Sequence, residues 1–157
     1  MSRKSPKLPL TDEERSALRK EKIRLGDIFE LSPDVLSEKL NISMARARYL
    51  VGMSIFQRIP SIGPNMAHNV VKDLGFHSYE DIKNEKGEDL IIDLEKKYGV
   101  WMDPCVEDSL RCVVHHANNP NSTKNWWDFT TQRKNYRQTH GYPSDRPTKA
   151  WDEGRTS

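Results

Sequence analysis

The ten residues RIPSIGPNMA, numbered 58–67, lie between two segments that predict helices. Pro64 is expected in the first turn of the second helix, where its missing N–H costs nothing. Gly75 is expected to end that helix in the left-handed conformation. A turn of this kind leaves backbone N–H groups exposed at the start of the second helix, where the helix dipole is positive. Because Gly63 has no Cβ, a phosphate could approach closely. The stretch therefore predicts a phosphate-binding turn.

Helix signals continue on both sides of this turn. Thr11 and Glu14 form a capping-box pattern, and Ser32 and Ser43 are expected N-caps. No segment alternates apolar and polar residues strongly enough to predict a strand. The segments 40–45 and 62–67 also resemble each other at a spacing of 22 residues, and each leads into a helix. We therefore expect an all-α protein in which two helix–turn–helix units stack on each other.

The turn resembles the helix-hairpin-helix motif of DNA repair and replication proteins. The matching residues are Pro60, Ile62, Gly63, Pro64 and Ala67. The resemblance implies a tandem arrangement with one near-complete and one degenerate hairpin. It also implies binding to the DNA backbone through hairpin amides, independent of base sequence, sometimes with a monovalent cation on turn carbonyls.

Two positions depart from the motif. Ser61 stands where the first glycine is expected, and it can make the turn if its φ stays negative. Asn65 stands where lysine or arginine often supplies a charge, which removes one ionic contact. The hairpin is therefore expected to bind DNA more weakly than a full match, or to serve only as a packing unit.

A longer segment, residues 56–127, resembles the small bacterial proteins of the pathogenicity locus family. The resemblance is carried by IPSIGPNMA at 59–67, LGFHSYEDI at 74–82, DPC at 103–105, RC at 111–112 and WWD at 126–128. Because the role of that family is poorly defined, the resemblance supports the fold more than the function.

These observations predict a set of DNA-contacting residues. The hairpin supplies backbone amides, and nearby basic side chains add positive charge. The predicted contacts are Arg46, Arg48, Arg58, Ser61, Ile62, Gly63, Asn65, Met66 and Lys72.

Composition sets the organisation of the chain. Of its 157 residues, 35% are hydrophobic and 31% charged, so the core is expected to be modest. Basic ends flank an acidic block within residues 76–118, which carries ten Asp/Glu against five Lys/Arg. We expect a flexible basic arm at 1–10, a helical domain at 11–128 and an irregular basic and aromatic extension at 129–157. Aromatic and basic residues in that extension suit single-stranded nucleic acid, but the extension could equally wrap the helical body.

Other function classes find little support. Apolar runs are too short for a membrane span, and two cysteines favour a reduced, cytoplasmic location. Cys105 and Cys112 would lie about 10 Å apart along one helix, too far for one zinc ion or a disulfide, so core packing is expected. No hydrolase, zincin or P-loop motif occurs, so no metal or organic cofactor is expected.

The sequence thus favours a non-catalytic DNA-binding protein without base specificity. The alternative is a protein-interaction adaptor whose acidic block, residues 80–108, meets a basic partner. A metal-dependent nucleic-acid enzyme is the third reading.

Overall fold

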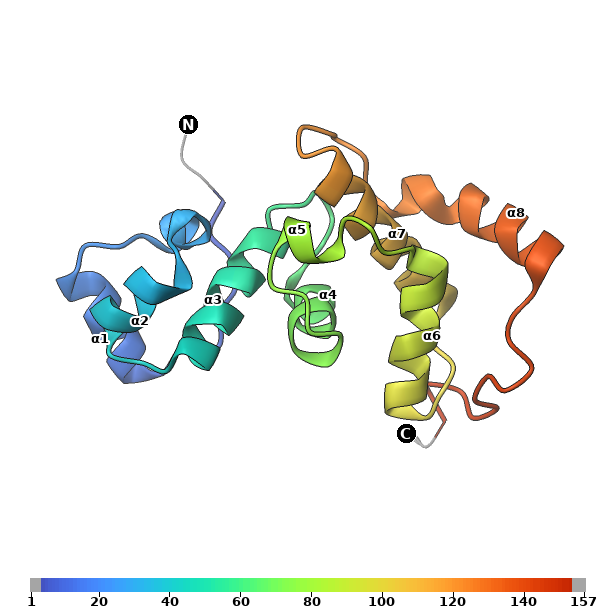
Figure 1. Ribbon diagram of the computed structural model, residues 1–157, viewed down its shortest axis with the longest axis horizontal. Coiled ribbons are helices and arrows are strands. Elements are labelled where there is room, and N and C mark those ends of the chain that lie inside the picture. The colour runs from blue at the N-terminus through green and yellow to red at the C-terminus, as the bar shows by residue number, and fades with distance from the viewer. Residues whose placement is uncertain (1–3, 154–157) are drawn as a thin grey trace. The chain divides into compact units, whose positions relative to one another are not determined.

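The structure, a computed structural model, describes residues 4–153. These residues form helices and connecting segments, and no strand occurs among them, so the predicted all-α class is confirmed (Figure 1). The chain divides into two compact units after Ser78. Within the described range, no helix is both long and apolar enough to cross a membrane.

The first unit contains a series of short helices. They are α1 (Asp12–Lys20), the 3₁₀ helix η1 (Leu25–Glu30), α2 (Pro33–Leu40), α3 (Met44–Phe56), α4 (Pro64–His68) and the π-helical turn η2 (Asn69–Asp73), which continues α4 directly. The predicted capping box between Thr11 and Glu14 is present. Ser32 and Ser43 accept backbone hydrogen bonds as N-caps, as predicted. The helix η1 was not predicted from the sequence.

Helix α3 organises the core of this unit. It packs against α2 and η1, and also against α4 and η2. Leu50 and Phe56 on α3 are fully buried, as are Ile28 of η1 and Leu36 of α2. At Gly52 a Cβ would lie 3.1 Å from a methyl group of Val71, so glycine allows η2 to approach α3 closely.

Residues 4–10 differ from the flexible arm expected there. Leu8 is buried, and the backbone N–H and C=O of Lys7 both bond the Gln57 side chain at 2.9 Å. This segment therefore packs against the end of α3. Residues 1–3 of the expected arm lie outside the described residues.

The second unit is built around α7. Its elements are α5 (Tyr79–Ile82), α6 (Gly87–Tyr98), α7 (Pro104–Asn118), the 3₁₀ helix η3 (Trp126–Phe129) and α8 (Thr130–His140). Helix α7 contacts each of the other four elements. Helix α8 lies in the extension expected to be irregular, whose last residues, 154–157, are outside the described part of the chain.

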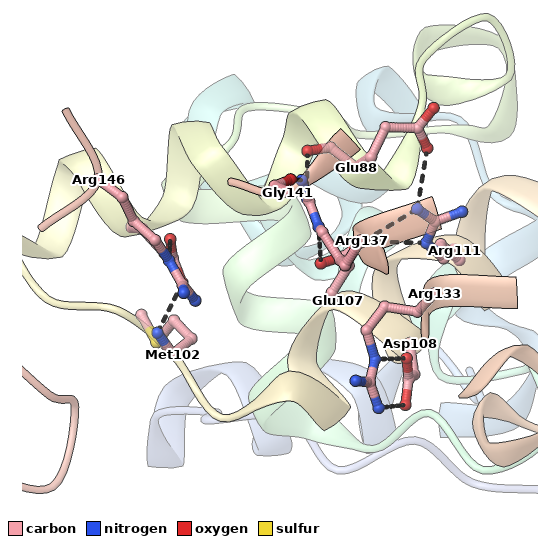
Figure 2. Close-up of polar contacts among 10 residues, drawn as sticks. Glu88, Met102, Glu107, Asp108, Arg111, Arg133, Arg137, Gly141 and Arg146 are labelled. Carbon is pink, nitrogen blue, oxygen red and sulfur yellow. Dashed lines mark hydrogen bonds and ion pairs between the residues drawn. The ribbon is translucent and has the colours of Figure 1, made fainter. Parts of the chain in front are cut away.

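Three buried carboxylates hold the C-terminal segment of this unit in place (Figure 2). Glu95 on α6 is fully buried, and Glu107 and Asp108 on α7 are each 1% exposed. Arg146 binds both oxygens of Glu95 at 2.8 Å. From α8, Arg133 binds Asp108 at 2.8 Å and Arg137 binds Glu107 at 3.0 Å. These ion pairs join α8 and the segment after it to α6 and α7.

Tyr142 of the extension contributes to the same packing. The guanidinium of Arg146 lies 3.7 Å from the centre of the Tyr142 ring, and that of Arg137 lies 4.2 Å from the same ring. The ring thus covers two arginines that already neutralise buried carboxylates. Of the two readings of the extension, the structure supports the one in which it wraps the helical body.

Removing one of these arginines should destabilise the protein. Arg146→Met keeps an unbranched apolar side chain but leaves the Glu95 carboxylate buried without its ion pair. We expect a loss of about 3–5 kcal/mol in the free energy of unfolding, measured by urea denaturation. Lys134→Met is the matched control, because Lys134 is exposed on α8; its expected change is within about 0.5 kcal/mol. Equal unfolding midpoints for the two variants would show that the Glu95 pair does not hold the segment.

Candidate nucleic-acid interface

The turn between α3 and α4 is a tight β-turn with buried apolar residues at both ends. The N–H of Ile62 donates to the carbonyl of Ile59 at 3.1 Å, and both side chains are 1% exposed. Ser61 has a φ of 67°, in the left-handed region. A turn with proline at its second position and a residue of positive φ at its third position is a type II turn. The condition that Ser61 can make the turn only with a negative φ was therefore wrong, because this turn is of type II and holds Ser61 in the conformation that glycine adopts most easily.

Three backbone N–H groups remain open after the turn. Gly63 is the N-cap of α4, and within residues 4–153 the amides of Gly63, Asn65 and Met66 donate to no protein group. The first amide bonded within the helix is that of Ala67, which donates to Gly63 at 3.1 Å. Of the predicted contacts, Ile62 cannot supply a donor, because its own amide is used in the turn and its side chain is buried.

Gly63 has no role in the backbone that requires glycine. Its φ of −98° and ψ of −171° suit any residue, and a Cβ there would meet no atom within 4 Å. Neither its φ nor the surrounding space requires glycine, which is also a favoured residue at the N-cap of a helix. Without a side chain, the open amides are directly accessible from outside the molecule.

The start of α3 provides a comparison within the same chain. Ser43 is its N-cap, and the Ser43 hydroxyl accepts a hydrogen bond from the N–H of Arg46 at 3.1 Å. The turn before α3 and the turn before α4 correspond to each other at a spacing of 20 residues, rather than the 22 predicted from the sequence. In each turn a residue with positive φ, Asn41 or Ser61, stands two positions before the N-cap. At α3 a side chain caps the third amide, whereas the same amide at α4, that of Met66, is open.

Arg46 has an internal role that the sequence did not predict. Its guanidinium binds both carboxylate oxygens of the buried Glu14 at 2.9 Å and the carbonyl of Pro9 at 2.6 Å. The hydrogen bonds from Arg46 lower the pKa of the Glu14 carboxyl, although its burial acts in the opposite direction. The positive charge of Arg46 is thus largely neutralised within the first unit, which leaves little of it for a phosphate.

The other predicted cations are exposed. Arg48 and Lys72, with Arg46, line one open depression between α3 and the α4–η2 helix, with a volume of about 580 Å³. Arg58 does not line it, and its guanidinium stacks 3.7 Å from the centre of the Phe29 ring. The structure therefore divides the predicted residues between the turn and the depression, except for Arg58, which belongs to neither.

Sequence reasoning missed two residues of this depression. The hydroxyl of Tyr49 lies 2.9 Å from Nδ1 of His68, and their rings meet edge to face at 5.8 Å between centres. The residues are 19 positions apart and come into contact because α3 and α4 lie against each other. The packing of these two helices against each other could have been anticipated from the predicted helix–turn–helix unit.

The cysteines pack within the second unit. Burial raises the pKa of the Cys105 thiol to about 11 and that of Cys112 to about 12, so both are protonated at neutral pH. Cys112 and His116 each contact the carbonyl of Lys124, at 3.8 and 2.8 Å. In the described part of the chain, no three His, Cys, Asp or Glu side chains are grouped so as to hold a metal ion.

The strained turn residue gives a direct stability test. Ser61→Gly should raise the free energy of unfolding by about 1 kcal/mol, because glycine adopts positive φ without a steric cost. Ser61→Ala retains the Cβ and the strain, and it should give no gain. The measurement is urea denaturation of the three proteins. If glycine and alanine had equal effects, the left-handed conformation of Ser61 would be contradicted.

Comparison with known proteins assigns the chain to a family. The profile described as pathogenicity locus matches residues 51–135, which are 85 of the 157 residues and include the turn and the start of α8. No curated protein and no solved structure matches the chain. The matched segment contains the motifs on which the resemblance rested, from IPSIGPNMA to WWD. The chain belongs to the pathogenicity locus family.

Proposed function

We propose that this chain is a non-catalytic, cytoplasmic DNA-binding protein that contacts the phosphate backbone without reading base sequence. The observation that carries the proposal is the set of open amides at Gly63, Asn65 and Met66. The first of these residues, Gly63, is a glycine that the backbone conformation does not require. A phosphate oxygen can accept hydrogen bonds from such amides, and the positive end of the α4–η2 helix dipole favours its charge.

The charge of the first unit supports this role. Residues 1–78 contain 13 Lys/Arg and 9 Asp/Glu, a formal charge of +4, whereas the whole chain carries +2. Exposed Arg48, Arg58 and Lys72 contribute to that excess. Charge attracts a polyanion over a distance, while the turn fixes one phosphate in place.

The turn also supports the wider resemblance. We assign α3, the turn and α4 to a helix-hairpin-helix unit, and α2 with α3 to a degenerate second one that shares α3. The resemblance also implies a monovalent cation on turn carbonyls, and the carbonyls of Ile59 and Gly63, which each accept one hydrogen bond, retain a lone pair. Such a cation would add positive charge beside the phosphate.

The adaptor alternative has less support from the contacts. It requires the acidic block to meet a basic partner, yet Glu95, Glu107 and Asp108 are already paired with arginines of the same chain. The most buried part of that block is thus neutralised internally.

Gly63→Asp tests the proposal without weakening the fold. Aspartate is a good N-cap, so its carboxylate should accept from the Met66 amide and also repel a phosphate. We expect affinity for a blunt DNA duplex, measured by fluorescence anisotropy, to fall about tenfold or more. For the natural chain, raising salt from 50 to 200 mM should weaken binding by roughly 10- to 100-fold if about three phosphates are contacted.

The control carries the same new charge elsewhere. Thr123→Asp changes an exposed residue of the second unit and should leave the affinity unaltered. Incubation with Mg²⁺ should yield no cleaved DNA. Equal affinities for Gly63→Asp and the natural chain would remove the turn from the interface. Absence of binding by the natural chain would favour the adaptor, and metal-dependent cleavage would favour an enzyme.

A further inference from the structure

The depression between α3 and the α4–η2 helix combines features that a simple phosphate contact does not need. Its volume of about 580 Å³ is in the range of about 300–1,000 Å³ typical of small-molecule sites. Its walls include the apolar side chains of Ala45 and Val71 and the rings of Tyr49 and His68. A phosphate alone would leave most of this surface uncovered.

The aromatic pair is held in a defined arrangement. The hydrogen bond between the Tyr49 hydroxyl and His68 fixes the two rings edge to face. Burial raises the pKa of the Tyr49 hydroxyl, so the phenol stays neutral. Arg46, anchored by Glu14, lies with its guanidinium 5.5 Å from the centre of the Tyr49 ring. The wall is therefore built by contacts that do not depend on a ligand.

Positive charge lies at the exposed edge of the same depression. Arg48 comes from α3 and Lys72 from η2, and both are exposed. An aromatic and apolar surface with cations at its edge is complementary to a nucleotide. The base of a nucleotide stacks on aromatic side chains, and its phosphate attracts cations.

The depression lies near the open turn, on the same helix. Lys72 follows Asn65 by seven residues along the continuous α4–η2 helix, a separation of roughly 10 Å or less. Successive nucleotides advance about 3.4 Å each along the axis of a duplex, so this distance, measured along that axis, corresponds to at most about three nucleotides. One strand could thus reach both places.

We propose that this depression binds one unstacked nucleotide, with its base against Tyr49 and His68 and its phosphate near Arg48 and Lys72. The inference rests on the proposed function, because the turn would hold the same strand within about three nucleotides. A paired base cannot leave the helical stack without cost, so the natural occupant is an unpaired end or gap. The DNA preferred by this chain is then a duplex adjoining a single-stranded segment. A free mononucleotide offers the same chemistry and is distinguished by the test.

The test compares three DNA ligands by anisotropy with the full chain. They are a blunt duplex, the same duplex with a three-nucleotide overhang, and that duplex with an overhang of three abasic nucleotides. The overhang should bind about tenfold more tightly than the blunt duplex. The abasic overhang has the same phosphates but no bases, and it should lose most of that gain. Equal affinity for the normal and abasic overhangs, or for the overhang and the blunt duplex, would overturn the inference.

Tyr49→Leu provides the protein control, since leucine retains an apolar side chain but cannot stack. It should bind blunt duplex like the natural chain and lose the preference for the overhang, with an unchanged circular dichroism spectrum. A retained preference would exclude Tyr49 from the site and contradict the proposal.

A third measurement separates failure of this inference from failure of the proposed function. Saturation-transfer NMR with deoxyadenosine monophosphate should show contact of its base protons with the natural chain and none with Tyr49→Leu. If none of the three DNA ligands binds but the mononucleotide does, the proposed function fails, and the site belongs to a free nucleotide rather than a strand. If duplex binds without preference for the overhang and the mononucleotide gives no signal, the proposed function stands and this inference fails.

Discussion

The turn from Ile59 to Ile62 is the constraint on which the candidate interface depends. Its two apolar ends are buried in the core of the first unit, and the hydrogen bond between them fixes the path of the backbone. The chain closes this turn with Ser61 in the left-handed region. The next residues then emerge at the surface with their amides unbonded, so the same packing that stabilises the hairpin also exposes its donors. At the start of α3 the Ser43 side chain caps the corresponding third amide, so the difference between the two helix starts is the open amide of Met66.

Charge has different uses in the two units. In the second unit, arginines of the C-terminal segment neutralise carboxylates that are almost fully buried, and Tyr142 covers two of them. Because breaking a buried pair is costly, these arginines are structural, and the basic and aromatic pattern of the extension does not indicate a nucleic-acid surface. In the first unit, Arg46 is similarly paired, but Arg48 and Lys72 remain exposed at the edge of a depression. The candidate interface is thus confined to the first unit.

The helix starts could be predicted from the sequence because caps depend on residues within a few positions. The signals at Thr11, Ser32 and Ser43 were all confirmed. Helix α8 was missed because it has few apolar residues, and what holds it is Asp108, 25 positions before Arg133. The role of Arg46 was missed for the same reason, since its partner Glu14 is 32 positions away. Sequence reasoning located the turn but not the φ of Ser61, because the two buried isoleucines that set it act through the tertiary core.

The central claim, that the open amides receive a phosphate, can be measured at those amides. In ¹⁵N-labelled protein titrated with a short blunt duplex, the amide resonances of Gly63, Asn65 and Met66 should shift together and saturate. The amides of Arg46 and Ala67, which already donate to protein acceptors, should shift much less. If the three open amides stay unchanged while resonances elsewhere shift, DNA binds another surface and the account of the turn is contradicted.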